Sequence, residues 1–280
     1  MPDPERSTDL LWGERPRRGL SLGRIVRAAV ELADTEGVAA VSMRRLAERL
    51  GYTTMALYRH VPGKAELLAL MRDEVLGESA AEPGAVRRAT GWRAELEAWA
   101  REGMALHERH PWLAETGDAR QVPGPNAVAG FEHGLSIVAQ TGLPPAQVVA
   151  AVNLVGGFVE STARQAAAAA RAQERTGVSD EEWWSGRDSL FAHLDHRYPT
   201  LNRLYREGAY DAPPDPFEFG LQRVLDGVEA LICDERRDEK ECGACGRPVA
   251  VGPAGRPREY CSRACQQRAY RKRRGEATKG

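Results

Sequence analysis

The sequence predicts an all-α protein with three parts: an N-terminal three-helix helix-turn-helix domain, a larger helical core and a small cysteine-rich module. Alanine, leucine, arginine and glutamate dominate the 280 residues, and aromatic residues make up only 6%, which favours helix over sheet. Apolar residues recur at steps of three and four along much of the chain, as on one face of a helix. Four of the five cysteines follow residue 241, where the composition changes abruptly.

Composition also bounds the setting in which the protein works. The formal net charge is −1, so any nucleic-acid surface has to be sought in local patterns of charge. The first nine residues are polar and have no apolar stretch of the kind found in signal peptides. The longest apolar run, residues 148–159, is shorter than the roughly 18 residues that span a bilayer. We therefore expect a cytoplasmic protein with no membrane partner, in which disulfides are rare.

The first part of the chain is expected to form four helices after a disordered arm. Residues 1–20 are rich in proline and charge, end near the basic cluster Arg15–Arg18, and are predicted to be disordered. The apolar period then begins at Leu22 and ends at Gly37. Ser42 is placed to cap a second helix that Gly51 ends. A third helix is predicted over residues 54–60 and a fourth over residues 64–77.

The second and third of these helices have the pattern of a helix-turn-helix. Gly51 supplies a short turn, Ala47 provides a small side chain where the helices cross, and Leu46, Leu50 and Leu57 hold the pair together. The outward side chains of the later helix of the pair, residues 54–60, mix hydroxyl, apolar and cationic groups. This mixture suits contact with bases in the major groove and with the phosphates beside it. On spacing alone, an ordinary helical hairpin with a solvated face is an equal alternative. The predicted DNA-binding residues are Arg44, Thr53, Thr54, Met55, Tyr58, Arg59, His60 and Lys64.

The middle of the chain, residues 85–233, is predicted to be a helical core. Helices are expected over residues 91–109, 125–141, 145–172, 188–206 and 216–233, separated by breaks rich in proline and glycine. Residues 173–187 are predicted to form a loop. The helix that starts near residue 145 is apolar nearly all round, which is typical of a core or a subunit interface. No arrangement of nucleophile, acid and base is recognisable, so we expect a protein that is not an enzyme.

The last part of the chain has the spacing of a four-thiolate zinc site. After a charged linker predicted over residues 234–241, Cys242 and Cys245 form one pair, and Cys261 and Cys265 form a second pair fifteen residues on. Two such pairs supply the tetrahedron of soft ligands that zinc prefers. A module of residues 242–274 with so little apolar core needs a metal to fold. The alternatives are a labile thiol cluster or a disulfide pair.

The N-terminal motifs resemble the DNA-binding domain of the TetR family of repressors. The matching stretches are RIVRAAVELAD at 24–34, MRRLAERLG at 43–51, ALYRHV at 56–61 and KAELL at 64–68. The resemblance covers about residues 21–77. It implies that Arg44, Thr54, Met55 and His60 lie near bases and that Tyr58 and Lys64 contact phosphates. It also implies a homodimer, because two recognition helices must reach successive major grooves about one turn apart.

The core resembles the C-terminal domain of the tetracycline-repressor branch of the same family. The resemblance rests on HPWL at 110–113, GPN at 124–126, GLPP at 142–145 and the closing helix at 217–232. It implies an effector pocket for a small molecule whose binding releases the repressor from double-stranded DNA. The predicted pocket residues are His107, Trp112, Phe131, His133, Asn153 and Phe158. The rival hypothesis is a zinc- or redox-responsive regulator in which the cysteine module is the sensor.

Overall fold

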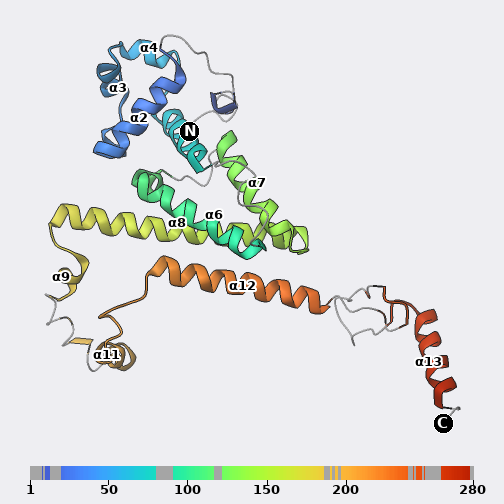
Figure 1. Ribbon diagram of the computed structural model, residues 1–280. Helices are drawn as coiled ribbons and strands as arrows, with labels where there is room; N and C mark the ends of the chain where they lie inside the picture. Colours follow the sequence, from blue (N-terminus) through green and yellow to red (C-terminus); the bar gives the residue numbers. More distant parts are fainter. Residues whose placement is uncertain are drawn as a thin grey trace.

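Every regular element in the described part of the chain is a helix, which confirms the predicted fold class. The computed structural model describes residues 8, 10–12, 20–79, 91–116, 122–185, 190, 193–194, 197–238, 242, 244–247, 249 and 260–277. The predicted basic cluster Arg15–Arg18 lies outside these residues. The helices form an N-terminal bundle, a larger helical core and a C-terminal module (Figure 1).

The N-terminal bundle consists of α2 (Leu22–Glu36), α3 (Met43–Leu50), α4 (Thr54–Tyr58) and α5 (Lys64–Leu76). Its helix starts are set by local chemistry. The Ser21 hydroxyl accepts a hydrogen bond from the backbone N–H of Arg24, and the Ser42 hydroxyl accepts one from Arg45. The apolar stripes meet in one buried cluster, which includes Ile25, Val26, Leu46, Leu57, Val61, Leu67, Leu70 and Met71.

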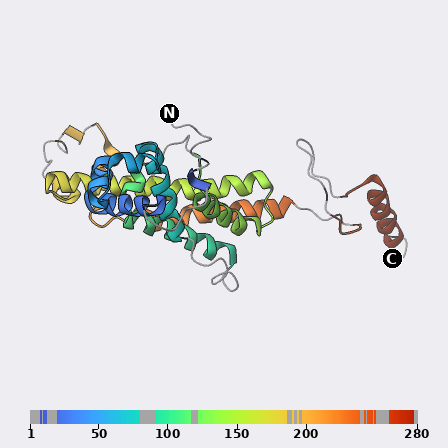
Figure 2. The ribbon, with the colours of Figure 1, turned by 90° about the horizontal axis from the view of Figure 1, so that it is seen from above.

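The larger core is built around α8 (Pro145–Thr176), which contacts α6 (Gly91–Arg109), α7 (Pro125–Ala139) and α12 (Pro216–Asp238). The helices α8 and α12 run side by side along the body of the protein (Figure 2). The facing sides of these four helices bury a second apolar cluster, which includes Leu96, Ile137, Val152, Val155, Val159, Leu221, Leu225 and Val228.

The helix α8 is also long and apolar enough, by length and composition, to cross a membrane. It is the one such helix among the described residues. The apolar run expected at residues 148–159 makes up only part of this helix, and the charged Glu160 follows it directly. Since α8 contributes Val148, Val152, Val155 and Val159 to the buried cluster, its apolar character serves the packing of the core.

Three segments differ from the sequence prediction. The expected loop at 173–187 begins with the last turn of α8, which ends at Thr176, and it continues into α9 (Asp180–Ser185). The helix expected over 188–206 is broken by a turn at Arg197, and α11 (Pro199–Arg206) starts afresh. The break has a simple cause, because a residue that precedes proline is disfavoured in the helical region. The predicted linker at 234–241 is still part of α12 as far as Asp238.

The N-terminal arm is also more ordered than predicted. Residues 10–12 are helical, and Leu11 is buried in the cluster of the N-terminal bundle. The indole Nε1 of Trp12 donates a hydrogen bond to the carbonyl of Pro123, at 3.3 Å. The structure is therefore helical at residues 10–12, where the sequence predicts a disordered arm over residues 1–20.

Several polar contacts join the bundle to the core, and two of them centre on aspartates of the bundle. In the first, the carboxylate of Asp34 accepts a hydrogen bond from Trp112 Nε1 at 2.7 Å and lies 2.7 Å from His110 Nδ1. In the second, the buried Asp73 of α5 reaches the start of α7, where its Oδ1 accepts the backbone N–H groups of Asn126 and Ala127, both at 3.1 Å. These contacts fix the bundle against the core.

Candidate DNA-reading surface and cysteine cluster

The turn between α3 and α4 depends on the conformation of Gly51. This residue has φ 75° and ψ 31°, in the left-handed region where glycine is strongly favoured. The N–H of Gly51 reaches the carbonyls of Ala47 and Glu48, and the N–H of Tyr52 donates to Ala47 at 2.9 Å. These bonds satisfy the open carbonyls at the end of α3 and reverse the chain. The predicted roles of Gly51 and the buried Ala47 are confirmed.

The helix α4 is short but anchored at both ends. Its first turn is capped by the Thr53 hydroxyl, which accepts the N–H of Ala56 at 3.3 Å. Leu57 is fully buried and holds the helix against the bundle. With one face anchored in this way, the opposite face points away from the protein, and Met55, at 68% exposure, is its most exposed large apolar side chain.

The predicted DNA-binding residues lie together around α4. Met55, Tyr58 and Arg59 are exposed, whereas Thr54 and His60 are partly buried at its edges. Arg44 lies on the neighbouring α3 with 84% of its side chain exposed, and its Nε is 3.0 Å from Glu48 Oε1. Such an exposed ion pair contributes little to stability, so Arg44 can leave Glu48 at small cost. Lys64 is exposed at the first position of α5.

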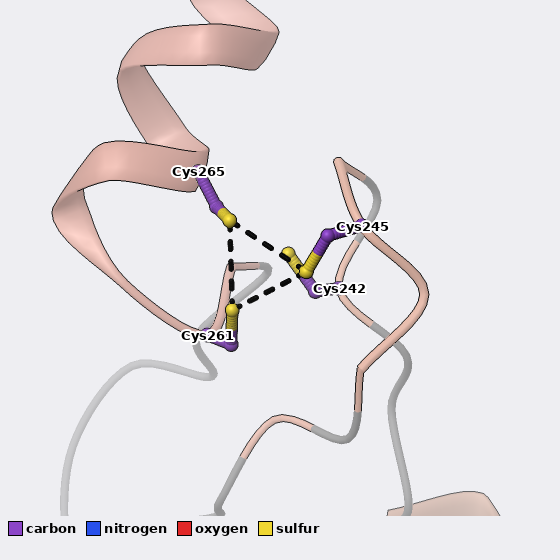
Figure 3. A group of neighbouring side chains, drawn as sticks. All are labelled: Cys242, Cys245, Cys261 and Cys265. Atoms are coloured by element: carbon purple, nitrogen blue, oxygen red, sulfur yellow. Dashed lines mark hydrogen bonds between the residues drawn. The ribbon is translucent and has the colours of Figure 1, made fainter.

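The second constellation is the cysteine cluster. It consists of four Sγ atoms that all lie within 4.8 Å of one another, those of Cys242, Cys245, Cys261 and Cys265 (Figure 3). The first pair sits on a tight knuckle: the N–H of Cys245 and the N–H of Gly246 both donate to the carbonyl of Cys242, at 3.1 and 2.9 Å. The second pair opens α13 (Arg263–Ala277). The spacing in the sequence therefore does bring four thiols to one point.

Crowding and hydrogen bonding shift the acidity of these thiols in opposite directions. Hydrogen bonds from Arg247, through its backbone and its side chain, lower the pKa of Cys245 to about 6. The hydrogen bonds of Cys261 with Cys245 and Cys265 raise the pKa of Cys261 to about 12. One thiol of the cluster therefore ionises readily, and its neighbour resists taking a second negative charge. A bound cation would offset this repulsion and stabilise all four groups as thiolates.

The predicted pocket residues do not converge in the same way. Trp112 is 2% exposed and belongs to the junction with the bundle, where it bonds Asp34. Phe158 stacks on Phe217 of α12, with ring centroids 5.9 Å apart. Phe131 and His133 on α7 are exposed, as is Asn153 on α8. The sixth residue, His107, is partly buried on α6, and its Nδ1 donates to the Gly103 carbonyl at 2.9 Å.

A residue that sequence reasoning did not single out, Trp99, holds three helices of the core together. Its Nε1 on α6 donates to the carbonyl of Gly130 on α7 at 3.2 Å. A Cβ atom placed on Gly134 would lie 3.2 Å from its ring, and one on Gly156 of α8 would lie 3.6 Å away. The helices can approach the indole this closely because both positions are glycine. The signal in the sequence was the recurrence of glycine in two otherwise apolar helices.

Taken together, the capped helix pair and the exposed face of α4 define a DNA-binding regulator of the helix-turn-helix class. Comparison with known proteins places the chain more closely. Residues 25–71 match the family "Bacterial regulatory proteins, tetR family", and residues 87–232 match the "Tetracyclin repressor-like, C-terminal domain" family. The chain therefore belongs to the TetR family of transcriptional regulators, a family of DNA-binding regulators and not of enzymes.

Individual relatives agree with this assignment. The HTH-type transcriptional repressor DrrR1 of Streptomyces coeruleorubidus is 43% identical over 242 residues, which cover 84% of this chain and 88% of the relative. The tetracycline repressor protein class C of Escherichia coli is 27% identical over 214 residues, covering 74% and 90%. Among solved structures, the Streptomyces coelicolor TetR family protein ActR in complex with actinorhodin is similar with a TM-score of 0.61 and 28% identity, over 77% of this chain and 98% of that one.

Proposed function

We propose that the protein is a homodimeric transcriptional repressor that reads a palindromic operator through α4. The observation that carries this proposal is the α3–α4 pair, in which Gly51 makes the turn and Leu57 anchors one face of α4 while Met55 and Tyr58 stay exposed on the other. A rigid helix of this kind fits the major groove of DNA.

The residues around α4 divide into two roles. Arg44, Thr54, Met55 and His60 would meet base edges, where hydroxyl, apolar and cationic groups distinguish one base pair from another. Tyr58, Arg59 and Lys64 would hold phosphates, as would Thr53 at the start of the helix, and so set the register of the helix on the duplex. The two groups predict different phenotypes, because base contacts carry sequence preference and phosphate contacts carry affinity.

The homodimer is supported by the outer faces of α8 and α12. Leu154 and Phe219, each 54% exposed, present large apolar side chains there. Gly157 on α8 and Gly227 on α12 are exposed, and a Cβ atom on either would meet nothing within 4 Å. An apolar surface with glycines that allow close approach suits a helix pair from a second copy. In such a dimer two copies of α4 would read two half-sites.

Release by a small molecule is the second half of the proposal. The solved relative ActR was crystallised with actinorhodin, and the core of this chain has the same fold. We propose that the effector binds within the α6–α7–α8 core near Trp99, and that His107 of α6 and Phe131 of α7 are among the residues it contacts. An effector that favours one orientation of the N-terminal bundle would shift the population away from the DNA-binding spacing. Repression of transcription takes place in the cytoplasm, where we place the protein.

The experiment is a selection of genomic fragments by the purified full-length protein. The proposal predicts a discrete inverted repeat whose half-sites lie about one helical turn apart. It also predicts that the gene next to this site is transcribed more strongly when the regulator is deleted. A selection that returns only unspecific fragments would overturn the DNA-reading role, and a gene that falls silent on deletion would make the protein an activator.

For the cysteine cluster we propose zinc as the ligand. The donor set fits, because four sulfurs within 4.8 Å of one another match the tetrahedral thiolate sites that zinc prefers. The metal would hold the knuckle at Cys242 against the start of α13 and so replace the apolar core that the module lacks. Native mass spectrometry of the purified chain should show one zinc ion per chain.

Two cysteine variants make the zinc test specific. Cys265→Ser should lose the metal, whereas Cys233→Ser, which alters the exposed cysteine of α12 outside the cluster, should keep it. A protein that binds zinc equally well in both variants would contradict the assignment. The exposed Cys245 also keeps the sensor hypothesis open to test: if the module is the sensor, removal of zinc by a chelator should release the operator.

A further inference from the structure

The C-terminal module carries a charge opposite to that of the rest of the chain. Residues 242–280 contain ten Lys/Arg and two Asp/Glu, which gives +8. The whole chain carries −1, so residues 1–241 carry −9. Four thiolates around a divalent zinc ion would lower the module to about +6, still strongly positive. The module lies outside both matched family regions, which cover residues 25–71 and 87–232.

Three of the ten basic residues of the module lie on one exposed side of α13. Cys265 is buried against the cysteine cluster and marks the inner side of this helix. Arg263, Gln267 and Arg271 are exposed and follow each other at steps of four, on the side away from Cys265. Arg268 is exposed beside them. Among the described residues, none of the three arginines forms an ion pair.

The start of α13 is held in place by the module itself. The Ser262 hydroxyl accepts the N–H of Cys265 at 3.3 Å, and the Ser262 carbonyl accepts the N–H of Gln266 at 3.0 Å. Because Cys261 and Cys265 flank this cap, a metal bound to the cluster would lock the first turn of the helix. The arginines are then presented from a rigid support, which reduces the entropy lost when they bind.

We propose that this face of α13, defined by Arg263, Gln267, Arg268 and Arg271, binds the sugar-phosphate backbone of duplex DNA beside the operator. Arginine and glutamine are typical donors to phosphate and sugar oxygens. Single-stranded RNA is a poorer fit, because its recognition relies on several stacking aromatic rings and residues 242–280 contain only Tyr260 and Tyr270. The inference rests on the proposed operator binding, which brings the tethered module to DNA at a high effective concentration.

The test compares salt dependence of DNA binding between full-length proteins. The probe is the selected operator with about 30 base pairs, roughly 100 Å, of duplex on each side. The triple variant R263Q/R268Q/R271Q removes the charges on α13, and R175Q/R203Q/R206Q removes three exposed arginines of the core as a matched control. Both variants should keep one zinc ion per chain, which shows that the module is still folded.

The expected result follows from counterion release. If the six arginines of a dimer each contact a phosphate, the slope of log K against log salt becomes shallower by about 5 in the α13 variant, and the operator affinity in low salt falls well over tenfold. The control variant should keep the slope of the unaltered protein. An unchanged slope in the α13 variant overturns the inference. This holds also if the α13 variant has lost binding to RNA or to a protein, because the partner of α13 is then not DNA.

Failure of the operator-reading proposal would look different. In that case the unaltered protein would find no discrete site, but the same titration on a duplex of unrelated sequence still reports the contribution of α13. A slope that changes in the α13 variant there supports the module's role, and an unchanged slope rejects it.

Discussion

The capping of α7 by Asp73 allows a quantitative prediction about how the N-terminal bundle is joined to the core. The residue at the cap position of α7, Gly124, has no side chain to offer. Instead Asp73 of α5 supplies its carboxylate, which accepts the N–H groups of Asn126 and Ala127 at 3.1 Å and is 2% exposed. The side-chain amide of Asn126 also donates to the Asp73 carbonyl at 2.9 Å. One helix is therefore capped by another.

Asp73→Ala should lower the free energy of unfolding by about 2–4 kcal/mol. Loss of a helix cap costs about 1 kcal/mol, and the buried N–H groups also lose charge-assisted hydrogen bonds of about 1.5–3 kcal/mol each, part of which water recovers. For a chain of this size the midpoint of thermal unfolding should fall by roughly 3–7 °C. The assay is thermal unfolding followed by circular dichroism at one fixed protein concentration, since a dimer's midpoint depends on concentration.

Two other variants separate this account from a general effect of losing an aspartate. Asp73→Asn keeps an acceptor oxygen and should lose less stability than Asp73→Ala. Asp215→Ala removes the exposed side chain that caps α12 through the N–H of Glu218 and should lower the free energy of unfolding by only about 1 kcal/mol. If Asp73→Ala lowers the midpoint no more than Asp215→Ala does, the bridging role of Asp73 is refuted.

The remaining predictions concern the turn and the dimer. Gly51→Ala forces a side chain into the left-handed region and should destabilise the bundle by about 1–2 kcal/mol in urea unfolding, whereas no loss would mean that the turn can change conformation. Gly157→Arg places a charged side chain on the outer face of α8 and should convert the dimer to a monomer in analytical ultracentrifugation, with operator binding lost; a stable dimer would locate the interface elsewhere.

The DNA-reading part of the fold could be predicted from sequence because its signals are local. Ser21 and Ser42 cap the helices that follow them, and Gly51 adopts the left-handed conformation that its position in the turn requires. Each of these features is settled by neighbours within a few residues. The cysteine cluster was equally accessible, since two closely spaced pairs of thiols leave few other arrangements for a metal site.

The core was harder to predict because its contacts join residues far apart in the chain. Trp112 was assigned to the pocket, yet its indole bonds Asp34, which lies 78 residues earlier. Phe158 packs on Phe217 of α12. Both are apolar side chains on helices, and the periodicity that marks them as buried does not say which neighbour buries them. The cap that Asp73 gives to α7 has no local signal either.

The central claim, that α4 reads the operator, is tested most directly by measuring base preferences at every position of the selected site. The measurement compares the unaltered protein with Met55→Ala, which alters a proposed base contact, and with Lys64→Ala, which alters a proposed phosphate contact. We predict that Met55→Ala relaxes the preference at symmetric positions of the two half-sites by about 1–3 kcal/mol, whereas Lys64→Ala weakens binding uniformly across sequences. A Met55→Ala protein with the same base preferences as the unaltered one would contradict the account.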